Sequence, residues 1–117
     1  MDKQTTPATC GRIPVKTGRR YVFLRPEEID CIEAERNYIK IQSGGESFLC
    51  RLTLAAIESR LADSRLVRVN RSAMVNIDRI RELRLDAAYR YEVVMDGGRS
   101  WSWGRTFRGN LQRVLAS

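Results

Sequence analysis

Short segments in which apolar and polar residues alternate, separated by turn residues, recur along most of this 117-residue chain. In the segment 38–42, isoleucines alternate with polar residues, and the pair Gly44-Gly45 follows. The sequence Asp96-Gly97-Gly98 is a second turn signal of the same kind. Alternation with a period of two is typical of strands with one buried face, and glycine suits tight hairpin turns. The pattern therefore predicts antiparallel hairpins, and it argues against a helix-turn-helix or a parallel α/β sheet.

The rest of the pattern divides the chain into short strands with two or three short helices. We expect strands at 12–15, 20–24, 29–33, 38–42, 47–51, 66–70, 74–76, 80–85, 88–94 and 100–103, the first two joined by a Lys-Thr-Gly turn. Expected helices are one turn from Pro26, a helix from the cap Thr53 to near Asp63, and a last helix with Phe107, Leu111, Val114 and Leu115 on one face. The fold class is thus mainly β. Residues 1–11 are polar and small, which predicts a disordered lead or linker before one domain over residues 12–117.

Arginine dominates the charge of the chain. The formal net charge is +7, and 18 of the 21 basic residues are arginine. Residues 26–59 hold seven acids and three bases, whereas residues 60–84 hold seven arginines and three acids. A guanidinium group holds its donors in one plane that matches phosphate oxygens and the edge of guanine. The composition therefore favours a nucleic acid as partner.

The usual constellations of catalysis and metal binding are missing from the sequence. There is no histidine, so the commonest general base and metal ligand are absent. The cysteines Cys10, Cys31 and Cys50 show no CxxC spacing, and the last two lie among apolar residues as small core side chains. We therefore expect a protein that is not an enzyme, binds no cofactor or metal, and resides in a reducing cytoplasm. No apolar run reaches the length of a membrane span, and the N-terminus lacks the apolar segment of a signal peptide.

The segment RLVRVNRSAMVN, residues 65–76, contains three arginines and no acid. If its first half is a strand, Arg68 and Asn70 share one face. The following turn, Asn70-Arg71-Ser72, would then project Arg71 outward while Ser72 satisfies local backbone donors. This turn is the first candidate site.

Two interpretations of this turn are open. In the first, Arg71 bonds to guanine O6 and N7 or clamps a phosphate, and Asn70 pairs with adenine in the same groove. In the second, the guanidinium groups pair with Asp63, Asp78 or Glu82, and the turn is an ordinary surface feature.

Two further segments combine cations with groups that can bond phosphate. Arg36, Asn37 and Tyr38 lie where two predicted strands meet, and Lys40 follows on the polar side of its strand. Half-burial at a strand start is the alternative for Tyr38. Near the C-terminus, Arg105 and Arg108 share a helical face close to a helix N-terminus, whose free N–H groups favour phosphate. For Arg105 and Arg108, the alternative is an ordinary solvent-exposed helix face. Trp101 and Trp103, by contrast, are expected to pack in the core.

Several motifs, in this order along the chain, resemble the LytTR DNA-binding domain of bacterial transcription regulators. Residues 68–76, RVNRSAMVN, are similar to the family signature F-x-R-x-H-R-S-x-x-V-N. Residues 32–38, IEAERNY, resemble I-E-A-x-x-N-Y, and Thr53-Leu54 matches the start of the family's helix. Residues 103–107, WGRTF, resemble the closing S-R-x-[YF] element. The resemblance covers about residues 12–115.

The resemblance implies small antiparallel sheets with two or three short helices. It also implies sequence-specific binding of double-stranded DNA and regulation of transcription, with loops rather than a recognition helix in the major groove. Carried over by position, the resemblance implies these DNA-binding residues: Arg36, Asn37, Tyr38, Asn70, Arg71, Ser72, Arg105 and Thr106. The neighbouring cations Lys40, Arg68 and Arg108 complete the predicted set. Asn70 replaces the family's usual histidine and Gly104 its usual serine, so base preference cannot be copied from other members.

Regulators with this domain, among them response regulators of two-component systems, usually join it to a phosphoacceptor receiver, a membrane segment or another sensor. We therefore expect an upstream receiver or sensor domain that is absent from this chain, and a homodimer on paired DNA sites. The chain is expected to be an excised C-terminal domain or a small free-standing regulator. The alternative function is a β module that binds RNA or a protein partner without promoter selectivity. RNA binding would need exposed aromatics on a sheet face, for which Tyr89 and Tyr91 are the candidates.

Overall fold

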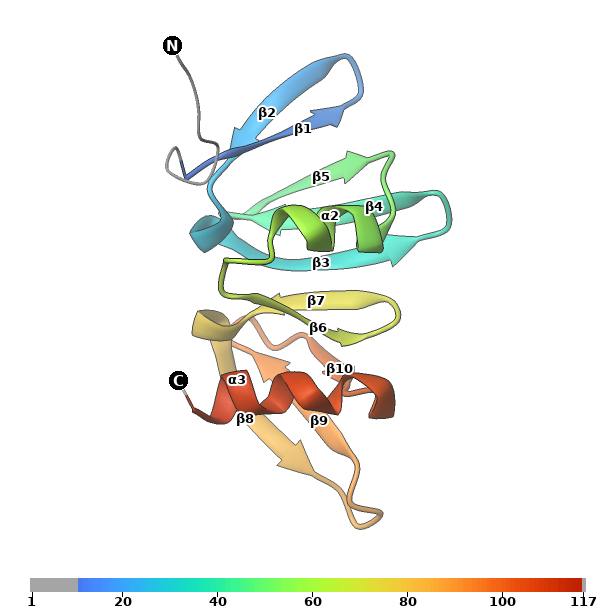
Figure 1. Ribbon diagram of the computed structural model, residues 1–117, viewed down its shortest axis with the longest axis vertical. Helices are drawn as coiled ribbons and strands as arrows, with labels where there is room; N and C mark the ends of the chain where they lie inside the picture. Colours follow the sequence, from blue (N-terminus) through green and yellow to red (C-terminus); the bar gives the residue numbers. More distant parts are fainter. Residues whose placement is uncertain (1–10, 117) are drawn as a thin grey trace.

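Three antiparallel sheets follow one another along the long axis of the molecule (Figure 1). The computed structural model describes residues 11–116, so nearly all of the expected lead lies outside the described residues. The first sheet is a hairpin of β1 (Ile13–Thr17) and β2 (Arg20–Leu24), and the last contains β8 (Ile80–Leu85), β9 (Tyr91–Met95) and β10 (Ser100–Ser102). The central sheet has the strand order β5 (Glu46–Cys50), β4 (Tyr38–Ser43), β3 (Ile29–Glu35), β7 (Ala73–Asn76) and β6 (Leu66–Asn70). The mainly β class predicted from the alternation is confirmed.

Short helical segments connect the strands. They are the 3-10 turns η1 (Pro26–Glu28), η2 (Ile77–Arg79) and η3 (Arg105–Asn110), and the α-helices α2 (Leu54–Arg60) and α3 (Leu111–Leu115). Thr53 caps α2 as predicted, because its hydroxyl accepts the N–H of Ala56 at 3.0 Å. However, α2 ends at Arg60, before the predicted Asp63. The predicted last helix is a 3-10 turn followed by one α-helical turn, and Leu115 is exposed rather than part of the buried face. None of the described helices is long and apolar enough to cross a membrane.

The central sheet separates two hydrophobic clusters. The first cluster contains buried apolar residues of α2 and the first hairpin, and the second contains buried apolar residues of the last sheet and α3. In β6, Leu66 belongs to the first cluster, whereas Val67 and Val69 belong to the second, as strand alternation requires. One face of the sheet is thus covered along most of its width, whereas the other face is covered over β3, β7 and β6 and is open at β5, where Leu49 is exposed.

The cysteines and tryptophans lie in the core, as the sequence predicted. Cys31 and Cys50 are buried free thiols, and burial raises the pKa of Cys31 to about 11. Trp101 and Trp103 pack in or against the second cluster, and the Trp103 Nε1–H donates to the backbone oxygen of Phe107 at 2.8 Å. These aromatic rings therefore serve packing rather than base stacking.

The start of β9 was predicted wrongly, because side-chain chemistry overrides the apolar pattern. The strand begins at Tyr91, and residues 86–90 form a turn. The Asp86 carboxylate accepts the backbone N–H groups of Ala88 at 2.8 Å and Arg90 at 2.9 Å. These bonds, the one from Arg90 foremost, lower the pKa of Asp86. Tyr89 consequently lies in the turn and does not share a sheet face with Tyr91.

The turn of the first hairpin is also shifted from its predicted place. β1 continues to Thr17, which pairs with Arg20, so Gly18-Arg19 forms the turn instead of Lys-Thr-Gly. Gly18 has φ +62°, a left-handed conformation that glycine adopts without strain. The shift places Arg19 at the exposed tip of the hairpin.

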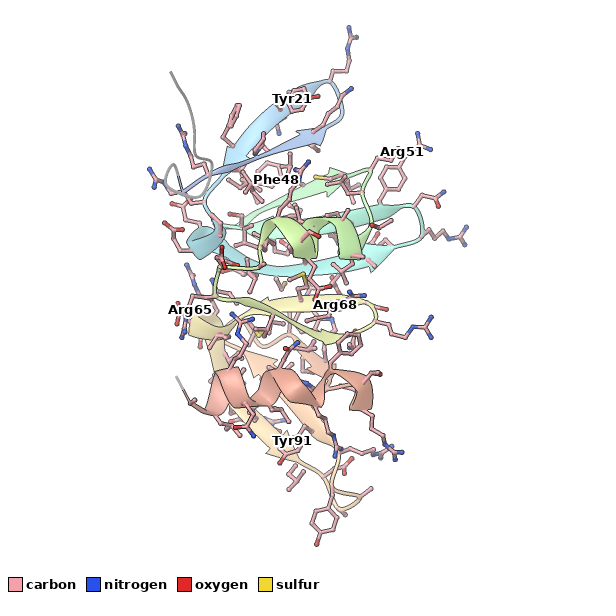
Figure 2. All side chains as sticks on the ribbon, in the orientation of Figure 1. Tyr21, Phe48, Arg51, Arg65, Arg68 and Tyr91 are labelled. Carbon is pink, nitrogen blue, oxygen red and sulfur yellow. The ribbon has the colours of Figure 1, made fainter. Side chains whose placement is uncertain are left out.

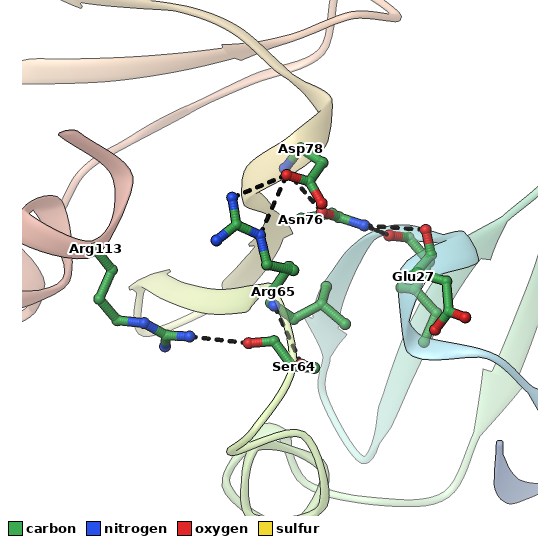
Figure 3. Close-up of polar contacts among 8 residues, drawn as sticks. Glu27, Ser64, Arg65, Asn76, Asp78 and Arg113 are labelled. Carbon is green, nitrogen blue, oxygen red and sulfur yellow. Dashed lines mark hydrogen bonds and ion pairs between the residues drawn. The ribbon is translucent and has the colours of Figure 1, made fainter. Parts of the chain in front are cut away.

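A polar hub around Asn76 joins the central sheet to the helical turns on either side of it (Figure 3). Asn76 is fully buried, and its Nδ2 donates to the backbone oxygens of Ile29 at 2.9 Å and Glu27 at 3.3 Å. Its Oδ1 accepts the N–H of Asp78 at 2.9 Å, and the Asp78 carboxylate in turn accepts Arg65 Nη2 at 2.9 Å. The hub thus fixes η1 and η2 to the sheet.

Candidate nucleic-acid interface

Three segments far apart in the sequence lie on one long edge of the molecule (Figure 1). They are the β3–β4 turn at Arg36-Asn37, the β6–β7 turn at Arg71-Ser72, and the start of η3 at Arg105-Thr106. The pairing explains their convergence: β3 and β6 both run antiparallel to β7, so both end on the same side of the sheet. The Gly104 N–H donates to the Val69 oxygen at 2.7 Å and brings the start of η3 to the end of β6. We call these three segments the reading edge.

At the β3–β4 turn, Arg36 has φ +55°, although it is not a glycine. A left-handed conformation is unfavourable for an L-residue, and such strain is concentrated at functional sites. Arg36 and Asn37 are exposed, and Tyr38 is 42% exposed. A shallow depression of about 390 Å³ beside the turn is lined in part by Arg36, Asn37 and Arg51. The turn and the neighbouring end of β5 therefore offer two cations, Arg36 and Arg51, and the Asn37 amide to a ligand.

The acidic residues near this turn are engaged with other groups. Glu35 pairs with Lys40 at 3.6 Å, so Lys40 is partly neutralised. Glu33 bonds to the Arg99 guanidinium and accepts Trp101 Nε1–H at 3.1 Å. Neither of these two carboxylates pairs with Arg36.

Asn70 shapes the β6–β7 turn. Its Oδ1 accepts the N–H of Ser72 at 2.7 Å, and its Nδ2 donates to the Ser102 oxygen of β10 at 2.9 Å. The Ser72 oxygen accepts the N–H of Ala34 at 2.8 Å. With both polar atoms of Asn70 bonded inside the protein, Arg71 is the side chain that extends from the turn into solvent.

Arg68 stabilises the same turn through hydrogen bonds to its backbone. Its guanidinium donates to the backbone oxygens of Asn70 at 3.1 Å and Arg71 at 3.0 Å, and it pairs with Glu58 at 2.8 Å. It also lies over the Phe107 ring, with Cζ 5.2 Å from the ring centroid, and its side chain is only 14% exposed. Arg68 thus has a structural role, because its side chain is largely buried and holds the backbone of the turn in place.

The start of η3 adds two arginines to the edge. Arg105 is exposed, and Arg108 lies over the Tyr91 ring at 5.6 Å and donates to the Tyr89 oxygen at 3.2 Å. Asn110 holds the segment in place, because its Nδ2 donates to the Arg68 oxygen at 2.8 Å. Both arginines line a groove of about 630 Å³ between η3 and the last sheet.

Within residues 11–116, no carboxylate pairs with Arg36, Arg71 or Arg105. The arginines that do have carboxylate partners there are Arg65, Arg68, Arg79, Arg84, Arg90 and Arg99. Figure 2 shows Arg65 at the edge opposite Arg51, and its partner is Asp78. The interpretation of residues 65–76 as an ion-paired turn is therefore correct for Arg65 and not for Arg71.

Sequence reasoning did not single out Arg51. In the β4–β5 hairpin, Ile39 pairs with Cys50, so the next residue, Arg51, lies beside Tyr38. Its Cζ is 5.7 Å from the centroid of the Tyr38 ring. The contact could have been predicted from the hairpin register. Counting outward from the turn at Gly44-Gly45 places position 51 opposite position 38.

Comparison with known proteins identifies relatives of this chain. The sequence profile of the LytTr DNA-binding domain family matches residues 19–116. Sensory transduction protein LytT of Bacillus subtilis (strain 168) is 26% identical over 113 residues, which are 97% of this chain and 47% of that protein. The chain thus spans about half the length of this relative.

A solved structure described as the LytTr DNA-binding domain of a methyl-accepting/DNA response regulator from Bacillus cereus has the same fold. It matches with a TM-score of 0.75 at 17% identity, covering 92% of this chain and 98% of that one. The expected small antiparallel sheets with short helices are confirmed by this likeness. All the motifs that carry the resemblance in the sequence lie inside the matched residues 19–116. The chain therefore belongs to the LytTr family of DNA-binding domains.

Proposed function

We propose that this domain binds double-stranded DNA sequence-specifically, regulates transcription, and reads the major groove with the three segments of the reading edge. One observation carries the proposal: Arg36, Arg71 and Arg105 are exposed on one edge, and no carboxylate within residues 11–116 neutralises them. A major groove about 12 Å wide admits a two-stranded ribbon, so hairpin turns of this kind fit it.

The contacts inside the protein suggest a division of roles. Arg71, which has no partner in the described part of the chain, is proposed to read a base, together with Asn37 from the neighbouring turn. Arg36, Arg105 and Arg108 are proposed to hold phosphates, and Thr106 and Ser72 to add hydroxyl bonds to the backbone. Tyr38 and Lys40 would then contribute at the rim, since Lys40 already pairs with Glu35. Arg68 and Asn70 are proposed to position the β6–β7 turn rather than to touch DNA.

Sequence-specific binding is tested by selecting bound duplexes from a random-sequence pool. The selected duplex then competes with single-stranded RNA for binding to the protein. We expect a defined motif and little competition by RNA. RNA recognition depends on exposed aromatics on a sheet face, and the two candidate tyrosines do not form such a platform, because Tyr89 lies in a turn. Recovery of duplexes without any shared motif would contradict sequence-specific reading.

Replacement of Arg105 by alanine is expected to weaken binding to every duplex about equally, roughly threefold to tenfold, because a phosphate contact carries no base information. The slope of log affinity against log salt should also become shallower by about 0.9. The wild-type slope should correspond to about 4–6 phosphates per protomer. Fluorescence anisotropy titrations over a range of salt concentrations measure both quantities. A loss confined to the selected motif would instead assign base reading to Arg105.

Replacement of Arg36 by glycine is expected to move stability and binding in opposite directions. Glycine adopts φ +55° without strain, so the free energy of unfolding should rise by about 0.5–1 kcal/mol. DNA affinity should fall, because a cation of the reading edge is lost. Arg36→Lys is the matched control, since it keeps both the charge and the strain. Thermal melts and DNA titrations of the two variants check this, and unchanged affinity of the glycine variant would remove Arg36 from the interface.

A homodimer on paired sites and an upstream receiver or sensor domain are also proposed. The relative from B. subtilis is described as a sensory transduction protein, and this chain matches 47% of it. Sedimentation of the domain with duplexes that carry one or two copies of the selected motif would show whether two protomers bind together.

A further inference from the structure

A basic groove lies beside the reading edge, between the first hairpin and the end of β5. Its volume is about 490 Å³, and its walls include Lys16 and Tyr21 of the hairpin together with Tyr38, Arg51 and Arg60. The lining thus contains three cations and two phenol groups, and no carboxylate. Such a wall suits an extended anion with several oxygens.

The cations of this region are not neutralised within the described chain. Residues 12–25 hold five bases and no acid. Arg51 lies over the Tyr38 ring, and Arg60 donates to the Pro14 oxygen at 2.9 Å, so neither meets a carboxylate in residues 11–116. The Lys16 side chain is exposed on β1, opposite Tyr21 in the register. The groove therefore keeps a local positive charge that no carboxylate among residues 11–116 pairs with.

The groove is continuous with the reading edge. Arg51 lines both this groove and the depression beside Arg36 and Asn37. Figure 1 shows the β1–β2 turn on the same side of the molecule as the β3–β4 and β6–β7 turns. Figure 2 shows Tyr21 on the hairpin and Arg51 at the end of β5. An anion that follows the edge past the β3–β4 turn would enter the groove.

We infer that this groove binds the sugar-phosphate backbone of DNA beyond the segment read by the three loops, with Lys16 and Tyr21 as phosphate contacts. The inference rests on the proposed function and extends its footprint. The molecule is 54 Å long, whereas one turn of B-DNA spans about 34 Å, so the edge is long enough for contacts beyond a single turn. These contacts add affinity and salt dependence without base preference.

The test compares two duplexes, one trimmed to the positions that show base preference in the selection and one extended by about one helical turn, ~10 base pairs, on each side. The double variant Lys16→Gln/Tyr21→Phe removes one charge and one hydroxyl group, both from exposed side chains. It should bind the extended duplex roughly threefold to tenfold more weakly than wild type, with a salt slope shallower by about 0.9, and bind the trimmed duplex like wild type. Arg81→Gln is the charge-matched control, because Arg81 is exposed on β8 in the last sheet.

The possible results separate the groove from the proposed function. Equal behaviour of the double variant and Arg81→Gln on both duplexes would overturn the groove contact while leaving DNA reading intact. An equal loss on both duplexes would also overturn it, since the contact would then lie within the read segment. If wild type bound neither duplex, the proposed function itself would fail. Melting temperatures of the variants show that the fold is retained.

Discussion

Replacing Arg71 with alanine is expected to weaken binding to the selected DNA motif by about 1–3 kcal/mol and to relax base choice at one position. The guanidinium is exposed, it has no partner within residues 11–116, and its turn is fixed by Asn70 and Arg68. A preorganised turn loses little entropy on binding, so most of the bidentate interaction is available for discrimination. Because the Arg71 side chain makes no hydrogen bond, ion pair or ring contact within residues 11–116, stability should change by less than about 0.5 kcal/mol.

Arg65→Ala is the matched control for Arg71→Ala. Arg65 is also exposed and comes from the same arginine-rich segment, yet it pairs with Asp78 on the edge opposite Arg51 (Figure 2). Its replacement should leave DNA affinity and base choice nearly unchanged. Titrations against the selected duplex and its single-base variants measure both effects. If the two variants lost affinity alike, with base choice intact, general charge rather than a base contact would explain the role of Arg71.

The fold could be predicted from the sequence because each of its signals is local. Alternation identified the strands, and the glycine-containing turns identified the hairpins at 44–45 and 97–98. The errors also have local causes that depend on hydrogen bonds. The apolar pattern of residues 88–94 suggests a strand, but the Asp86 carboxylate binds the N–H groups of Ala88 and Arg90 and forms a turn. Propensity cannot show which of these two interactions is stronger.

The candidate site was less predictable, because partners distant in sequence decide each role. Arg68 and Arg71 are three residues apart and look equivalent in the sequence. Their difference arises from Glu58 and Phe107, which engage Arg68, whereas no side-chain partner engages Arg71 in the described part of the chain. Asn70 looks like a base reader as well, yet its amide bonds to the Ser102 oxygen, 32 residues away. Sequence patterns locate the reading edge, whereas the packing of three sheets sorts its residues into exposed and supporting ones.

Asn76 is part of the motif that suggested DNA binding, but its position indicates a structural role. It is fully buried, on the polar hub that ties η1 and η2 to the central sheet (Figure 3). Its amide makes three hydrogen bonds, to the oxygens of Ile29 and Glu27 and from the N–H of Asp78. The part of the motif that contains Asn76 thus supports the fold and makes no exposed contact.

Asn76→Ala is therefore expected to lower the free energy of unfolding by about 2–4 kcal/mol, because the buried backbone oxygen of Ile29 and the partly buried N–H of Asp78 lose their partners. The melting temperature should fall by roughly 10–20 °C. Asn37→Ala is the control, since Asn37 is exposed and its replacement should cost less than about 0.5 kcal/mol. Below its own transition, the Asn76 variant should still bind the selected duplex, because Asp78 of the hub pairs with Arg65, which lies at the edge opposite Arg51. Loss of DNA binding in a variant that melts like wild type would instead place Asn76 in the interface.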